Sequence, residues 1–112
     1  MKIAIPTANG KLDGHFGHTR LFTIYDVDDQ SKKINSKSEV EPPKHEPGVL
    51  PRFLRDQKVD VILTGGMGPS AQSMLEGFGV KVVMGVASVD VDQIVADYLA
   101  DSLVAGANTC DH

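Results

Sequence analysis

Four short runs of apolar residues and one polar run, separated by turn or loop signals, predict five β-strands. The first run covers residues 2–6 (KIAIP), and the Asn-Gly pair at 9–10 behind it favours a turn. Residues 21–27 carry apolar side chains mostly on alternate positions, as in a strand with one buried face, whereas 32–40 is polar and lysine-bearing, which is typical of an exposed edge strand. Residues 60–64 and 80–84 are compact apolar runs, so we predict that they are buried strands.

Three further segments have apolar residues at helical spacing. The first helix is predicted to begin at residue 49, with Pro51 tolerated in its first turn, and the second spans 70–76 and is stopped by glycines at 77 and 79. The third has Asp90 as its N-cap, Gln93 as capping-box partner, and Gly106 near its end. Its predicted buried stripe consists of Val91, Ile94, Val95, Tyr98 and Leu99.

The order of these elements, β-β-β-α-β-α-β-α, predicts one α/β domain over residues 1–106, followed by a short tail over 107–112. Crossovers of the β-α-β type are right-handed and make parallel neighbours, so strands 2–6, 60–64 and 80–84 should point the same way. Ligands of open α/β sheets bind outside the carboxyl ends of strands, where connections diverge. We therefore expect the functional site between the ends of strands 2–6 and 60–64.

Composition narrows the class of protein. A chain of 112 residues with 41% hydrophobic and 23% charged residues fits one globular domain. Its formal charge of -4 has the wrong sign for a protein that neutralises nucleic-acid phosphates, so we expect no nucleic-acid partner. The single cysteine, the start without a basic leader, and apolar runs far shorter than the roughly 20 residues of a membrane span predict a soluble, cytoplasmic protein.

Two histidines stand three positions apart in a glycine-containing segment, residues 13–18 (DGHFGH). Imidazole suits Zn, Cu, Fe or Ni, and the glycines allow close approach to a bound group. His15 and His18 are therefore candidate metal ligands. The alternative is that His18 packs at the start of strand 21–27 while His15 faces solvent, and the spacing by itself does not separate the two.

A glycine-rich segment, residues 65–69 (GGMGP), links strand 60–64 to helix 70–76. Backbone N–H groups at a helix N-terminus attract anions, so this loop could bind phosphate oxygens or cluster sulfides, although it lacks the Lys-Ser/Thr ending of a nucleotide-binding P-loop. The alternative is a tight turn whose methionine covers the sheet edge. The predicted cofactor-binding residues, at the carboxyl ends of strands 2–6 and 60–64, are Asn9, Gly65, Gly66, Met67 and Gly68.

Further candidate ligands lie in the tail and in the proline-rich loop 41–48. Cys110 and His112 could both serve a soft metal, and with His15 and His18 they would make a four-ligand set. The alternative for them is a frayed terminus. His45 is placed at the predicted ligand edge, where the alternative is a solvated loop histidine.

Five segments together resemble the dinitrogenase iron-molybdenum cofactor biosynthesis family: 2–7 (KIAIPT), 14–18 (GHFGH), 45–51 (HEPGVLP), 65–68 (GGMG) and 108–112 (NTCDH). The resemblance implies a ribonuclease H-like, three-layer α/β fold, a mixed five-stranded sheet with helices on both faces. It also implies an iron-sulfur or iron-molybdenum-sulfur cluster as cofactor, and it favours His15, His18, the glycine loop and Cys110 as its binding residues.

From these observations we predict that the protein is a small carrier without catalytic activity. It would accept a preformed anionic cluster from a donor protein and pass it to an acceptor protein. The amides of Gly66 and Gly68 would bond to sulfides, and one cysteine suits transient holding because protein-ligated clusters usually have four cysteine ligands. One alternative is a mononuclear Zn- or Ni-binding or regulatory protein. Another is a metal-dependent nuclease, which needs carboxylates to hold two cations, and strand 2–6 offers none.

Overall fold

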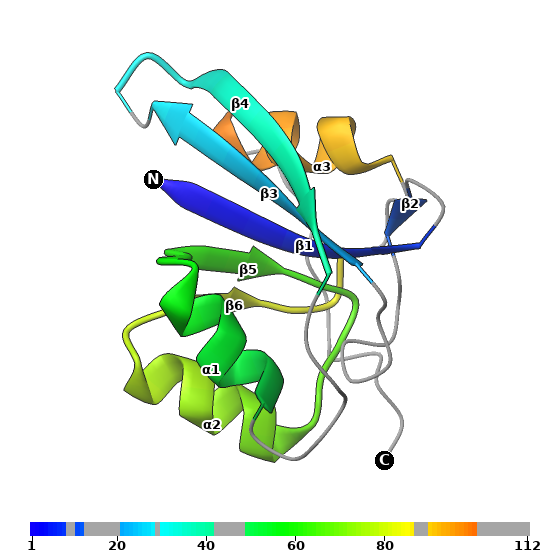
Figure 1. Cartoon of the computed structure of the whole chain (residues 1–112). Coiled ribbons are helices and arrows are strands. Elements are labelled where there is room, and N and C mark those ends of the chain that lie inside the picture. The colour runs from blue at the N-terminus through cyan, green and yellow to red at the C-terminus, as the bar shows by residue number, and fades with distance from the viewer. Residues whose placement is uncertain (9–10, 13–20, 29, 42–48, 87–89, 101–112) are drawn as a thin grey trace.

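A computed structural model describes residues 1–8, 11–12, 21–28, 30–41, 49–86 and 90–100, which form one sheet and three helices (Figure 1). The strands follow the order β4-β3-β1-β5-β6, and the short β2 pairs with β1 beside this path. The strands are β1 (Lys2–Ala8), β2 (Lys11–Leu12), β3 (Leu21–Asp28), β4 (Lys33–Val40), β5 (Val61–Leu63) and β6 (Lys81–Val83). The helices are α1 (Val49–Asp56), α2 (Pro69–Gly77) and α3 (Val91–Leu99).

The sheet is mixed, with the strand directions that the crossover rule predicts. β3 is antiparallel to both β1 and β4, while β5 is parallel to β1 and to β6. The carboxyl ends of β1, β4, β5 and β6 therefore share one edge, called here the carboxyl edge, and β4 is the exposed edge strand that its polarity predicts. All five predicted strands are present, and β2 is an addition that the hydrophobic pattern does not indicate.

β1 continues to Ala8, past Pro6, where a strand end was expected. Met1 and Val27 exchange both of their backbone hydrogen bonds, so the odd-numbered residues of β1 bond to β3 and the even-numbered ones face β5. The register of β1 with β5 runs through Ala4. Pro6, an even-numbered residue, faces β5, so its missing N–H interrupts no bond of the β1–β3 ladder and the strand can continue along β3.

The alternation of side chains along the central strands divides the core between the two faces of the sheet. Ile3 and Ile5 belong to the core cluster that includes Ile94 and Val95 of α3. Ala4 belongs to the opposite cluster, with buried residues of α1 and α2. The protein thus has three layers, with α1 and α2 on one face and α3 on the other (Figure 1). Both crossovers that contain α1 and α2 step in the same direction across the sheet, so their common right-handedness puts them on the same face.

α3 starts as predicted and ends earlier than predicted. The Gln93 N–H donates to the Asp90 carboxylate at 3.2 Å, which confirms the N-cap, but the Gln93 side chain bonds forward to Asp97 instead of returning to the cap. The helix ends at Leu99, its last residue in the core, and not near Gly106. None of the helices in the described ranges is long and apolar enough to cross a membrane.

Candidate functional site

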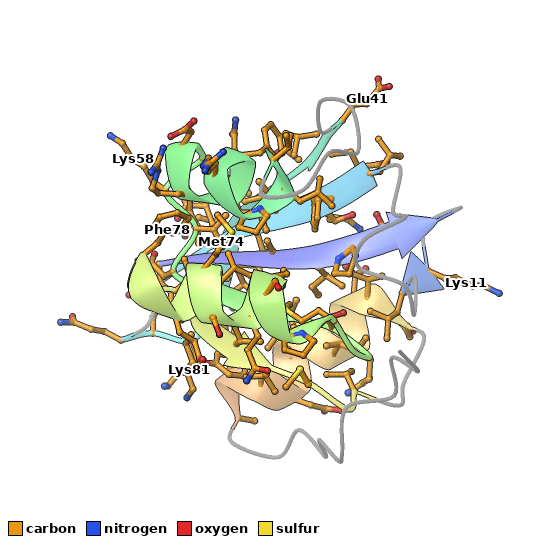
Figure 2. All side chains as sticks on the ribbon, turned by 90° about the horizontal axis from the view of Figure 1, so that it is seen from below. Lys11, Glu41, Lys58, Met74, Phe78 and Lys81 are labelled. Carbon is orange, nitrogen blue, oxygen red and sulfur yellow. The ribbon has the colours of Figure 1, made fainter. Side chains whose placement is uncertain are left out.

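The chain diverges at the carboxyl edge between β1 and β5, as the strand order requires. From β1 it leads to β2 and β3 on one side, and from β5 it leads through α2 to β6 on the other. This is the topological switch point at which open α/β sheets bind ligands. Figure 2 shows Lys11 of β2 and Glu41 after β4 at the end toward which β1 points, so charges of both signs lie near this edge.

The loop after β5 is held by backbone bonds to the segment after β6. The Thr64 N–H donates to the Val83 carbonyl at 3.0 Å, and the Val86 N–H donates to the Thr64 carbonyl at 3.2 Å. The Gly65 carbonyl accepts from the Gly85 N–H at 3.1 Å. These bonds extend the β5–β6 pairing beyond the strands, so the glycine loop is fixed in place rather than left as a free turn.

Thr64 is fully buried and fixes the next turn of the loop through its hydroxyl. The hydroxyl donates to the Gly66 carbonyl at 3.3 Å and accepts a long bond from the Gly66 N–H at 3.4 Å. The amide of Gly66, which was expected to face a ligand, is therefore directed at a side chain of the protein itself. The sequence pattern did not indicate this role for Thr64.

Met67 is fully buried and belongs to the core cluster between the sheet and the helices α1 and α2. Its side chain anchors the loop to the core. Met67 therefore packs in the core and does not cover the sheet edge, and its thioether is fully buried.

The N-terminus of α2 carries hydrogen-bond donors without a cap. Gly68 is the N-cap, with φ -68° and ψ 156° and no side-chain cap, and Pro69 at the first helical position has no N–H. The first helical bond runs from the Gln72 N–H to the Gly68 carbonyl at 3.1 Å. Within the part of the chain that the structure describes, the N–H groups of Gly68, Ser70 and Ala71 have no acceptor.

This helix terminus suits an anion for two reasons. The partial positive charge of a helix N-terminus and its unsatisfied N–H groups attract negative ligands. The first turn of α2 contains no acidic residue that would compete for them. Sequence reasoning found Gly68 but missed Ser70 and Ala71, although the Gly-Pro pair before them is the signal of a helix start without a side-chain cap.

Two more buried hydroxyls, which sequence reasoning also missed, connect β1 to β3 toward the same edge. Thr7 Oγ1 and Thr23 Oγ1 are 3.0 Å apart, and both side chains are buried. A hydrogen bond between them satisfies these groups in a region without solvent. They contribute rigidity below the switch point.

The other predicted site residues lie outside the described residues: Asn9, His15, His18, His45, Cys110 and His112. Their roles as ligands stay predictions. Among the residues that are described, no group of three or more His, Cys, Asp or Glu side chains could hold a metal ion. The described portion of the site is therefore an array of backbone donors, not a set of metal ligands.

Comparisons with known proteins agree with this fold. No curated protein matches the sequence. The crystal structure of a protein named PH0822 superposes with a TM-score of 0.86 at 28% identity, covering 94% of each chain. A Methanocaldococcus jannaschii protein provisionally named a dinitrogenase gives a TM-score of 0.76 at 17% identity and covers 96% of both chains.

A third solved structure is the apo form of the orange protein from Desulfovibrio gigas, with a TM-score of 0.73 and 22% identity over 96% of this chain and 93% of that one. At 17% and 22% identity, the similarity to the M. jannaschii protein and to the orange protein shows that they share the fold of this chain. The model of one protein family, described as dinitrogenase iron-molybdenum cofactor, matches residues 1–101. Because this match covers the whole described domain, the chain belongs to the dinitrogenase iron-molybdenum cofactor family.

Proposed function

We propose that this protein holds an anionic metal-sulfur cluster transiently at the carboxyl edge of its sheet, as a step in the handling of iron-molybdenum or iron-sulfur clusters. The observation that carries the proposal is the uncapped N-terminus of α2 at the switch point. There the N–H groups of Gly68, Ser70 and Ala71 meet no acceptor in the described chain.

The chemistry of this terminus fits the sulfides of such a cluster. Backbone amides donate hydrogen bonds to cluster sulfurs, and such bonds tune clusters in proteins. Gly68 has no side chain to shield the donors, while Pro69 fixes φ at the first helical position, so the donors are preorganised for a ligand. Thr64 and Met67 hold the loop against the core and keep this geometry when no ligand is bound.

Ligands to the exposed metal atoms of the cluster would come from outside the described residues. The proposal assigns this role to His15 and His18, with His45, Cys110 and His112 as further donors, and it keeps Asn9 as a cofactor-binding residue. Imidazole and thiolate both suit iron and other soft or borderline metals. A single cysteine favours release, because four thiolates would hold a cluster permanently.

The proposed role is binding and transfer between a donor and an acceptor protein, without catalysis. The family name refers to the iron-molybdenum cofactor, and the structure of the D. gigas orange protein is described as an apo form. The ribonuclease H-like class of the fold and a cytoplasmic location belong to the same proposal.

The test changes the charge at the helix cap without changing its geometry. Aspartate and asparagine both cap helices better than glycine, so Gly68→Asp and Gly68→Asn should fold at least as stably as the wild type. After anaerobic reconstitution with iron and sulfide, with and without molybdate, and desalting, we expect Gly68→Asp to retain about fivefold less metal than Gly68→Asn, equivalent to about 1 kcal/mol. The readouts are metal analysis and the absorption spectrum, with His15→Ala in parallel.

Three results would count against the proposal. Wild-type protein that retains neither iron nor molybdenum would overturn it. Retention by both Gly68 variants equal to that of the wild type would remove the helix terminus from the site, because either side chain caps the N–H groups proposed to bind the cluster. One equivalent of zinc without sulfide, in protein isolated from its own host, would favour the mononuclear alternative.

A further inference from the structure

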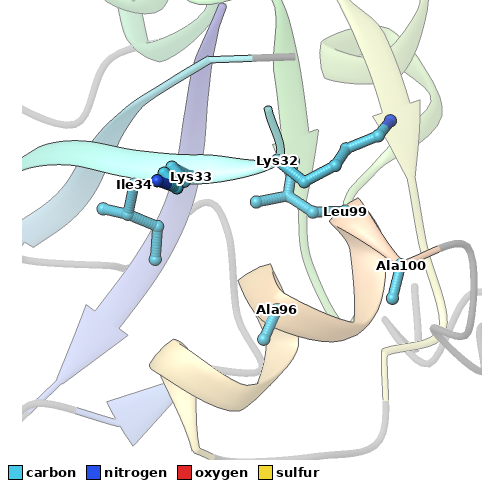
Figure 3. Close-up of a pocket in the computed structure, with 6 residues that line it drawn as sticks. All are labelled: Lys32, Lys33, Ile34, Ala96, Leu99 and Ala100. Atoms are coloured by element: carbon cyan, nitrogen blue, oxygen red, sulfur yellow. The ribbon is translucent and has the colours of Figure 1, made fainter. Parts of the chain in front are cut away.

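An open groove lies between the start of β4 and the end of α3, away from the proposed cluster site. It encloses about 520 Å³ and is lined by Lys32, Lys33, Ile34, Ala96, Leu99 and Ala100 (Figure 3). β4 runs parallel to β1, so its first residues stand at the edge from which β1 and β5 start. The groove is therefore at the opposite edge of the sheet from the glycine loop.

The groove exists because the side of α3 that faces β4 carries a longer side chain, Asp92, at its start and short alanine side chains further along. Asp92, Ala96 and Ala100 follow one another at four-residue spacing, so they lie along one side of the helix. Asp92 reaches across to β4, where its carboxylate is 3.2 Å from the ammonium of Lys37. The two exposed alanines cannot reach across, and the space beside them stays open.

The wall of the groove on β4 is an exposed apolar side chain. Ile34 pairs with Val27, whose side chain belongs to the core under α3, so Ile34 is on the same face of the sheet. Its side chain is nevertheless 42% exposed. Among the residues that the structure describes, Ile34 is the one large hydrophobic residue that is exposed to solvent. Leu99, which is buried, forms apolar floor below it.

Two lysines border this apolar surface. Lys32 is held in a left-handed conformation, with φ 60°, in the turn between β3 and β4. Its N–H donates to the Asp28 carbonyl at 2.8 Å, and the Asp28 carboxylate accepts from the N–H groups of Gln30 and Ser31. The ammonium groups of Lys32 and Lys33 form no hydrogen bond or ion pair with any residue in the described ranges. The residues that line the groove thus include two lysines and no acidic residue, which is a charge reversal within the lining on a chain with a formal charge of -4.

We propose that this groove docks an acidic segment of a partner protein, with a bulky apolar side chain of that segment against Ile34 and Leu99 and its carboxylates beside Lys32 and Lys33. The charge reversal selects an acidic partner, and the apolar floor selects one with an apolar anchor. The groove is open, whereas small-molecule sites enclose most of their ligand, so it fits a chain segment better. A partner bound there leaves the carboxyl edge accessible.

The test uses the full-length, unloaded protein labelled with ¹⁵N, so that its outcome does not depend on the cluster. The probe is a blocked peptide, Glu-Asp-Leu-Leu-Asp-Glu, and two control peptides replace either its acids by amides or its leucines by serines. We expect the amide signals of Ile34, Ala96 and Ala100 to shift with the first peptide, and either control peptide to bind at least tenfold more weakly. Raising the salt concentration should weaken binding as well, because the lysines are exposed.

Substitutions in the groove test whether the peptide binds there. Ala96→Leu, which fills the groove, and the double variant Lys32→Glu, Lys33→Glu should each weaken peptide binding at least tenfold. Lys58→Glu is the control on the other face of the sheet, behind α1. It makes the charge change of one of the two lysine substitutions, and it should leave binding within twofold of the wild type.

Other results would overturn the inference. The groove would not be the docking site if Ala96→Leu bound the peptide as well as the wild type, or if the shifts clustered elsewhere. Groove signals that depended on protein concentration without peptide would assign the groove to a second copy of the chain. Nuclear Overhauser contacts between Leu103 and Ile34 would assign it to the chain's own C-terminal segment.

Discussion

Tyr25 shows at the scale of one residue how a buried polar group ties a helix to the sheet. Its side chain is fully buried beneath α3, and its hydroxyl donates a bond of 2.6 Å to the carboxylate of Asp92. Burial raises the pKa of Tyr25, and the bond to Asp92 adds to that shift. The bond to Tyr25 and the ammonium of Lys37 lower the pKa of Asp92.

These shifts predict the pH range over which the contact stabilises the fold. Because the pKa of Asp92 is lowered in the folded protein, its contribution is present above the ordinary pKa of 3.8 and is lost as the pH falls below it. Because the pKa of Tyr25 is raised, its contribution is present up to about pH 10 and is lost as the pH rises further. We expect Tyr25→Phe to lower the free energy of unfolding by about 1 kcal/mol at pH 7 and by less at pH 3 and above pH 11, measured by urea denaturation. A loss that is the same at every pH would contradict this account.

Single residues also show which contacts can be predicted from the sequence and which cannot. The cap at Asp90 was predictable because an acceptor and its donor lie three positions apart in the chain. The role of Thr64 was not predictable, because its hydroxyl bonds to the backbone of a glycine whose place depends on the loop geometry. The bond between Tyr25 and Asp92 joins residues 67 positions apart, which no local pattern indicates.

At the scale of the element, α1 and α2 end in the same way with different residues. After α1, Lys58 has a φ of 60°, its N–H donates to Arg55, and the N–H of Val59 donates to Leu54. After α2, Gly79 has a φ of 86° and makes the corresponding bond to Glu76, and Val80 bonds to Leu75. Both are Schellman motifs, which favour glycine at the left-handed position.

This pair predicts stability changes of opposite sign. Lys58→Gly should raise the free energy of unfolding by about 0.5 to 1 kcal/mol, because it removes the strain of a left-handed side chain. Gly79→Ala should lower it by about 1 kcal/mol through the backbone, since an added Cβ meets nothing within 4 Å. Urea denaturation of the two variants checks both values, with Gly77→Ala as a helical control that also finds open space. A destabilising Lys58→Gly would contradict the assignment of the motif.

Most helices and strands could be predicted because each depends on a local pattern. Four of the five main strands follow from apolar runs and turn signals, and β4 follows from its polar, lysine-bearing pattern. The starts of the helices follow from capping and proline signals. Three features depend on neighbours instead. β2 exists through its pairing with β1, β1 passes Pro6 because its ladder with β3 continues on the other side, and α3 ends where its core contacts end at Leu99.

At the scale of the whole molecule, the three-layer fold creates two separate regions with different chemistry. The switch point gathers backbone donors at the carboxyl edge, and the groove gathers lysines and apolar side chains at the opposite edge. The first region could be predicted, because its glycine loop is one continuous segment and the topology rule gives its place. The groove could not, because Ile34 and Ala96 become neighbours through the packing of α3 on the sheet.

The central claim is that the N-terminus of α2 receives the anionic cluster, and its most direct test is a titration with tetrathiomolybdate, a small diamagnetic metal sulfide anion. Amide signals of ¹⁵N-labelled full-length protein are followed residue by residue, in the wild type and in Gly68→Asp. The account predicts that the amide protons of Gly68, Ser70 and Ala71 shift downfield together on titration, and that in Gly68→Asp the shifts of Ser70 and Ala71 need at least about fivefold more tetrathiomolybdate. Unchanged signals at these three residues, with tetrathiomolybdate bound elsewhere on the protein, would contradict it.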